Sequence, residues 1–198
     1  MSEVDTLEMV AQVDPISGEV IGRVERKKAH LEGIWHASIH LWILDREGDI
    51  LFQQRSLKTK AFPGLWDISV AGHIDEGEDG MREVLEELGV APQLDQIQKH
   101  GYLILEHNLP SFVNREHARM YLWKSELALS DFSFLDNSVQ ALASISKENF
   151  VAFIEGQAMM APVLRGGRIL EELVEGKDVV PQIPSYWSGV KTMLGFLE

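Results

Sequence analysis

Three glutamates near the middle of the chain have the spacing of a metal site. Glu83, Glu86 and Glu87 stand at positions i, i+3 and i+4, which places their side chains on one face of an α-helix. Like charges crowded in this way repel one another unless a cation lies among them. We therefore expect these three carboxylates to bind a divalent metal ion.

The type of ligand indicates which metal it is. Carboxylate oxygens without thiolates suit hard cations, foremost Mg²⁺ with Mn²⁺ as its substitute, and the chain has no cysteine. Protein-bound Mg²⁺ shares its remaining positions with water and substrate phosphates, so the pattern predicts attack of water on a phosphoanhydride. A glutamate-rich helix face is also often merely solvated. The glycines that bracket the segment, together with Arg82, favour the metal site.

The same segment resembles the Nudix box, a pattern written G-x5-E-x7-R-E-U-x-E-E-x-G-U in which U is a bulky aliphatic residue. The named positions are filled by Gly72, Glu78, Arg82, Glu83, Val84, Glu86, Glu87, Gly89 and Val90. Only residues 79–81 lie between Glu78 and Arg82, where the family has seven residues. A loss of four residues is about one helical turn and rotates the metal face by only roughly 40°. We therefore expect a box that is shortened but keeps its carboxylate cluster.

The resemblance extends from about Val10 to Trp187 and is close to the branch of the superfamily that includes the type I isopentenyl-diphosphate isomerases. The run from Ala61 to Asp67 is similar to a segment of those enzymes. Four further residues fall where the isomerases carry ligands of their metal site: His30, His36, His73 and Glu116. The resemblance implies either a second metal site there or histidines that are simply packed by hydrogen bonds.

Two replacements argue against isomerase chemistry. Ala71 stands where the isomerases have a cysteine that moves a proton on carbon, and Asn114 replaces a second acidic ligand. The Arg-Glu and Glu-Glu pairs of a hydrolase are complete. The resemblance therefore implies Mg²⁺-dependent hydrolysis of a diphosphate linkage in a nucleoside diphosphate derivative or a related organic diphosphate. The alternatives are a catalytically impaired Nudix-fold module that binds diphosphates and, less favoured, an isomerase-like protein.

Several residues outside the helix are expected to contact the substrate. Arg55, Lys58 and Lys60 form a basic patch, and an arginine at the place of Arg55 contacts the diphosphate in the related isomerases; a solvated loop is the alternative. Trp66 is expected to line the pocket. Gly72 is expected to let the backbone approach the metal or a phosphate closely.

Two residues are expected to assist the metal ligands. By the resemblance, Arg82 orients a neighbouring glutamate and does not touch the substrate. Glu116 is the candidate outside the box for an additional ligand or a general base, although it could also be an exposed glutamate at the start of a strand.

Length and charge bound the class of protein. With 198 residues, 45% hydrophobic and 25% charged, the chain fits a single Nudix domain spanning residues 1–198, with an N-terminal β-hairpin extension over 1–30 and the core and C-terminal helices over 31–198. The net charge of −13 argues against nucleic-acid binding. No transmembrane segment or signal peptide is recognisable, so we expect a cytoplasmic protein without membrane contact. A homodimer is expected only by analogy with the fold.

The order of expected elements predicts an α/β protein, an α/β/α sandwich with a mixed β-sheet. Alternation and apolar runs predict strands at Met9–Val13, Val20–Val24, Trp35–Leu44, Ile50–Gln54, Asp67–Val70, Lys99–Glu106, Glu116–Leu127 and Val139–Ile145. Besides the box helix, which Gly89 should end, helices are predicted from Ser146 to Ile154, from Arg165 to Leu173 and from Ser188 to Leu197.

Overall fold

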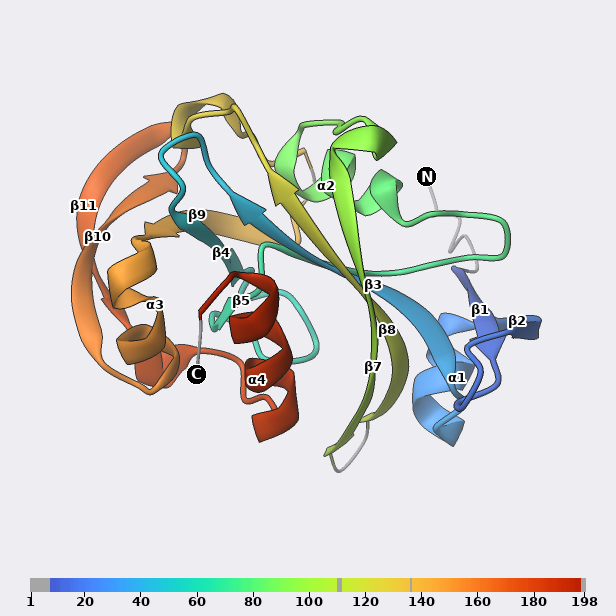
Figure 1. The fold of residues 1–198 in the computed structure, drawn as a ribbon. Coiled ribbons are helices and arrows are strands. Elements are labelled where there is room, and N and C mark those ends of the chain that lie inside the picture. Colours follow the sequence, from blue (N-terminus) through green and yellow to red (C-terminus); the bar gives the residue numbers. More distant parts are fainter. Residues whose placement is uncertain (1–7, 110–111, 136, 197–198) are drawn as a thin grey trace, which may run out of the picture.

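A mixed β-sheet runs through the protein in the computed structural model, which describes residues 8–109, 112–135 and 137–196 (Figure 1). Its strands are β1 (Met9–Val13), β2 (Val20–Glu25), β3 (His36–Leu44), β4 (Ile50–Arg55), β5 (Trp66–Asp67), β6 (Val70–His73), β7 (Ile97–Leu109), β8 (Phe112–Lys124), β9 (Val139–Ile145), β10 (Ala158–Arg165) and β11 (Arg168–Glu175). The helices are α1 (Arg26–Glu32), α2 (Met81–Leu88), α3 (Lys147–Ile154) and α4 (Pro184–Met193), with short 3₁₀ turns at Leu94–Gln96, Leu129–Asp131 and Gly176–Asp178.

Strand β3 organises the sheet. The main path runs β11-β10-β9-β4-β3-β1-β2, and β3 additionally pairs with β6 and β8. The pairing with β8 is parallel and places His36 opposite Glu116 at one end and Leu44 opposite Lys124 at the other. Every residue of β3 except Leu44 is buried, as expected of a central strand that is covered on both faces.

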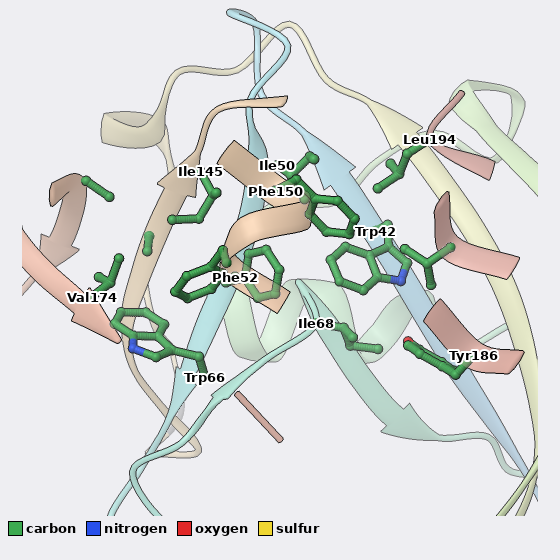
Figure 2. Close-up of a cluster of buried hydrophobic side chains, with 14 of the residues drawn as sticks. Trp42, Ile50, Phe52, Trp66, Ile68, Ile145, Phe150, Val174, Tyr186 and Leu194 are labelled. Atoms are coloured by element: carbon green, nitrogen blue, oxygen red, sulfur yellow. The ribbon is translucent and has the colours of Figure 1, made fainter. Parts of the chain in front are cut away.

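Helices cover both faces of the sheet and thereby confirm the predicted α/β/α sandwich. On one face Val84 and Leu88 of α2 pack in a cluster with Ile39 of β3. On the other face the core includes aromatic residues from β3, β4, α3 and α4 (Figure 2), and Trp42 contacts Phe52 edge-on with ring centroids 5.3 Å apart. Alternate residues of β3 therefore serve two separate cores.

Helix α2 is only eight residues long, about two turns. It begins after Gly80, and a Cβ at this glycine would lie 2.9 Å from the side chain of Ile39. The carboxylate of Asp79 accepts the N–H of Met81 at 2.9 Å. Gly89 ends the helix in the left-handed conformation and donates its N–H to the carbonyl of Leu85, so the predicted stop is confirmed.

The helix predicted from Arg165 to Leu173 is wrong. The chain there forms a hairpin in which β10 pairs antiparallel with β11 and Arg165 lies opposite Arg168. Gly166 and Gly167 form the turn with φ values of 57° and 74°. Two consecutive residues at positive φ fit the two-residue turns that match strand twist, so this pair makes a hairpin and does not begin a helix.

Other elements differ from prediction mainly in their bounds. The predicted strand Asp67–Val70 is divided between β5 and β6. Helix α4 begins at Pro184, earlier than predicted, because proline is favourable in a first helical turn; the predicted last residue, Leu197, lies outside the described residues. Helix α1 was not predicted. Ser146 precedes α3 as expected, although its side chain makes no capping hydrogen bond.

Within the described ranges, no helix is both long enough and apolar enough to cross a bilayer. The predicted N-terminal hairpin is present as β1 and β2 and joins the main sheet where Gln12 lies opposite His36. Residues 1–7 of the predicted extension lie outside the described residues. The division of the chain at residue 30 stays a prediction.

Candidate active site

The box begins on β6 and continues into α2, and these two elements meet at Gly72 and Glu83. A Cβ built on Gly72 would lie 2.3 Å from Cγ of Glu83 and 2.6 Å from one of its carboxylate oxygens. The absence of a side chain at Gly72 therefore makes room for the Glu83 carboxylate. The approach permitted by this glycine is that of a candidate metal ligand.

Arg82 lies among the acidic residues of the box. Its guanidinium contacts Glu83 at 2.8 Å, Glu86 at 2.9 Å and Glu78 at 3.6 Å. The side chain of Glu86 is 46% exposed, whereas that of Glu83 is 15% exposed. These contacts fit the predicted role of Arg82, in which it orients glutamates and balances their charge.

The protonation of Glu83 is set by competing effects. Burial raises the pKa of Glu83 to about 7, while the positive charge of Arg82 opposes the rise. Near neutral pH the carboxyl group is therefore close to half-protonated. A cation beside it would favour the ionised form.

Glu87 points to a different part of the sheet. It is 8% exposed, and Oε2 accepts a hydrogen bond of 3.1 Å from Nε2 of Gln53 on β4. Glu83 and Glu87 thus face the interior one turn apart, whereas Glu86 extends toward solvent beside Arg82. Carboxylate oxygens of this kind fit a hard cation such as Mg²⁺, with Glu87 buried and Glu83 partly buried; the structure does not turn Glu86 inward with them.

Three histidines from separate elements form the tightest donor group. His30 on α1, His36 on β3 and His73 on β6 each offer a nitrogen, and these atoms lie within 4.8 Å of one another. Among the residues that the structure describes, no other group of three His, Asp or Glu side chains reaches this proximity. His36 donates from Nδ1 to the carbonyl of Ile34 at 2.8 Å, so its Nε2 keeps a lone pair, and that atom is buried without a partner. This is the orientation of a typical metal-ligating histidine.

Burial keeps two of these imidazoles, His30 and His73, neutral. It lowers the pKa of His30 to about 4 and that of His73 well below its usual value, with repulsion from neighbouring charged groups acting in the same direction. Neutral imidazoles carry the lone pairs that bind zinc, manganese or iron. The donor set therefore fits a transition metal.

Glu116 on β8 lies next to this group, on the side of His73. Its carboxylate lies 3.9 Å from Nε2 of His73 and 3.4 Å from Nε2 of His40. Burial alone would raise the pKa of Glu116, but the hydrogen bond from His40 and the neighbouring imidazoles hold it below its usual value. Asn114 lies two residues earlier on β8, and its Oδ1 is buried without a partner. We call His30, His36, His73 and Glu116 the histidine–glutamate site.

The remaining predicted residues are Arg55, Lys58, Lys60 and Trp66. Arg55 donates to the carboxylate of Asp67 at 2.9 Å and to the carbonyl of Ala61 at 3.0 Å, while Lys58 and Lys60 are exposed. Trp66 is 4% exposed within the hydrophobic core. The side chain of Trp66 is thus placed as a core residue, and the substrate contacts of all four stay predictions.

Comparison with known proteins identifies the family. The sequence matches the NUDIX domain over residues 35–155. It is 30% identical over 144 residues to an uncharacterized Nudix hydrolase of Clostridium acetobutylicum, covering 70% of each chain. The chain belongs to the Nudix hydrolase family. Enzymes of this family hydrolyse diphosphate linkages in small molecules and generally use divalent metal ions, so the predicted family and enzyme class are confirmed.

Other Nudix relatives include proteins of both expected kinds. The chain is 32% identical over 148 residues to Nudix hydrolase 3 of Arabidopsis thaliana, covering 70% of this chain and 19% of that protein. It is 31% identical over 99 residues to the isopentenyl-diphosphate Delta-isomerase of Serratia proteamaculans, covering 48% and 55%. A crystal structure from Deinococcus radiodurans superposes with a TM-score of 0.53 at 22% identity, covering 75% of this chain and 89% of that one. The predicted Nudix fold is therefore confirmed.

Proposed function

We propose that this Nudix hydrolase cleaves the diphosphate linkage of a nucleoside diphosphate derivative or a related organic diphosphate, with Mg²⁺ at the box. The observation that carries the proposal is the Glu83 carboxylate, which is buried against Gly72 with its pKa raised to about 7 and contacts Arg82 at 2.8 Å. Burial disfavours the ionised form of this carboxyl group even with Arg82 beside it, and a further cation would favour that form. A metal ion bound by Glu83 would be such a cation, so the raised pKa of Glu83 supports a metal-binding role.

The residues of the box would have two kinds of role, metal binding and positioning of the metal ligands. Glu83 and Glu87 would hold the Mg²⁺ ion, with Glu86 at the exposed rim. When bound, Mg²⁺ supplies charge neutralisation at the diphosphate and lowers the pKa of an attacking water. Arg82 holds Glu83 and Glu86 in place through its two short contacts, and Gly72 provides the space that Glu83 occupies.

We assign Glu116 to the histidine–glutamate site, where it and the three histidines would hold a second metal ion such as zinc, manganese or iron. Support comes from the lowered pKa values of His30 and His73, from the buried and unpartnered Nε2 of His36 and from the buried carboxylate of Glu116. These are nitrogen and oxygen donors in a buried setting, which suits ions softer than Mg²⁺.

Substrate phosphates would be held by Arg55, Lys58 and Lys60. These side chains supply local positive charge in a chain whose net charge is −13. The exposed lysines are available to a ligand, whereas the contact of Arg55 with Asp67 at 2.9 Å would have to be shared with the phosphate. A homodimer and a cytoplasmic location also remain part of the proposal.

The test is Mg²⁺-dependent product release from a panel of nucleoside diphosphate derivatives, dinucleotides and isoprenoid diphosphates. Glu83→Gln and Glu87→Gln should each abolish most of the turnover, because the charge that binds the metal is removed while the shape is kept. Glu155→Gln, on an exposed residue after α3, is the matched control and should behave like the parent. Full turnover in Glu83→Gln would contradict the proposal.

One observation favours a second candidate function, a module that binds diphosphates without cleaving them. The side chain of Glu86 is 46% exposed at Arg82, unlike that of Glu83, and α2 is only eight residues long. If the parent protein binds a diphosphate but releases no product from any member of the panel, this second function replaces the first.

A further inference from the structure

Tyr186 enters the candidate site from outside the region that matches the Nudix family. It lies on α4, beyond the matched residues 35–155, and is fully buried. It projects from α4 into the core beside Trp42 (Figure 2). Its hydroxyl lies 3.1 Å from Nδ1 of His40, and the two rings meet edge-on with centroids 5.6 Å apart.

His40 connects this hydroxyl to Glu116. The imidazole is 5% exposed on β3, and its other nitrogen, Nε2, lies 3.4 Å from Oε2 of Glu116. An ionised carboxylate can only accept a hydrogen bond, so the proton between these groups must be on Nε2. In the tautomer with its hydrogen on Nε2, Nδ1 is an acceptor, which leaves the hydroxyl of Tyr186 as the donor.

The hydroxyl is suited to this role. Burial raises the pKa of Tyr186 well above its usual value, so the phenol keeps its proton throughout the physiological range. A protonated phenol beside Nδ1 favours the tautomer of His40 that carries hydrogen on Nε2.

We propose that Tyr186 is a positioning residue for the histidine–glutamate site: its hydroxyl fixes the tautomer and orientation of His40, which in turn holds the carboxylate of Glu116 directed toward His73. This inference rests on the second metal site of the proposed function. Outer groups that orient metal ligands typically change metal affinity by about 10- to 100-fold when they are removed. Helix α4 thereby completes a site whose ligands lie on α1 and three strands.

The first experiment compares Tyr186→Phe with the parent as full-length proteins. Phenylalanine keeps the ring that packs against His40 and Trp187 but removes the donor. Calorimetric titration with Zn²⁺ should show an affinity lower by about tenfold. Tyr121→Phe, in the core cluster on the opposite face of the sheet, is the matched control and should leave the affinity unchanged.

A second readout does not depend on metal. Nitrogen-15 NMR of the imidazoles in the metal-free parent should show His40 as a single tautomer protonated on Nε2. In Tyr186→Phe the two nitrogen shifts should move toward the values of a tautomer mixture. An unchanged His40 spectrum in Tyr186→Phe overturns the inference. If Zn²⁺ fails to bind the parent, the second metal site is wrong, and the NMR result still decides the role of Tyr186.

A double-mutant cycle separates positioning from packing. The amide nitrogen of a glutamine can donate from about the place of Nε2, so His40→Gln should keep Zn²⁺ affinity within a few-fold of the parent. Adding Tyr186→Phe to that variant should then cost nothing further, because the relay is already absent. An equal loss from Tyr186→Phe in both backgrounds would show that the tyrosine acts through packing alone and would refute the relay.

Discussion

Gly72 and His73 are neighbours on β6, but they face two different groups of donors. Gly72 adjoins Glu83 and the box, whose acidic residues all come from one short helix and the turn before it. His73 adjoins a site gathered from α1, β3, β6 and β8. Adjacent residues of a strand point to opposite faces, so a single strand separates two sites of different origin.

The two sites also balance charge differently. The box carries several carboxylates that share one guanidinium, and Glu83 is close to half-protonated at neutral pH. The histidine–glutamate site carries one carboxylate beside three imidazoles, and burial lowers the pKa of two of them, His30 and His73. Under the proposed function, the locally built site would need a hard cation to balance its carboxylates, whereas the donors of the site built across the sheet already lie close together.

The largest expected effect separates the two sites by function. Glu83→Gln should lower Mg²⁺-dependent kcat by at least about 100-fold, as is typical when a preorganised charge at the reacting group is removed. Zn²⁺ affinity at the other site should stay at the parent value in the same variant. Steady-state kinetics and calorimetry on one preparation measure both, and a parallel loss of both would show that the sites are not independent.

A substitution at His73 tests metal binding at the histidine–glutamate site, on the other face of β6. His73→Ala should weaken Co²⁺ binding by about 100-fold, since one of four donors is lost, and should abolish the visible absorption of a tetrahedral Co²⁺ complex. The matched control is His100→Ala, at an exposed position of β7. A Co²⁺ spectrum that persists in His73→Ala would place the bound ion elsewhere.

A smaller steric change at Gly72 should damage only the box. In Gly72→Ala the new Cβ would meet Cγ of Glu83 at 2.3 Å and force the carboxylate aside, so we expect kcat to fall by about tenfold, at a cost of roughly 1–3 kcal/mol in folding stability. Gly22→Ala on β2, whose Cβ would lie 3.6 Å from its nearest neighbour, is the control. Unchanged turnover in Gly72→Ala would mean that the position of Glu83 is not critical.

The mildest test uses pH. The pKa of Glu83 is raised to about 7 from 4.5, so the metal-free protein gains stability from this group at acid pH and loses it as the pH rises through about 7. Mg²⁺ requires the ionised form, so its affinity should increase by about tenfold between pH 6 and pH 8. His30 and His73 have lowered pKa values and change stability with pH in the opposite direction. The measurement is therefore the difference between the parent and Glu83→Gln in how unfolding free energy and Mg²⁺ affinity depend on pH. Equal pH profiles in both would contradict the assigned pKa.

Local signals predicted the box and much of the sheet. The stop at Gly89 follows from a glycine after an apolar helical stripe, and the apolar run of β3 reads as a buried strand. The hairpin of β10 and β11 was missed because Leu170, Leu173 and Val174 also have helical spacing. Cross-strand pairing with β10 decided the structure, and the glycine pair at the turn was the available signal.

The histidine–glutamate site could be predicted only through resemblance, since its members come from four separate elements. The partnership of His40 with Tyr186 was missed altogether, because 146 residues separate them. A signal was nevertheless present in the sequence: His40 stands inside an apolar run that reads as a central strand. A buried imidazole requires a hydrogen-bond partner, so a distant donor could have been sought.

The parallel pairing of β3 with β8 determines which side chains of β8 face the histidines, because alternate residues of a strand point to opposite sides of the sheet. Glu116 lies opposite His36, and its neighbour His117 lies opposite Ala37. Deleting one residue between Val113 and Glu116 without other adjustment would turn the acid toward the α2 side and present another imidazole to the three histidines. Moving β8 by two residues so that Asn114 lies opposite His36 would restore an oxygen donor, whereas moving it by two residues the other way would place Ala118 there, which offers none.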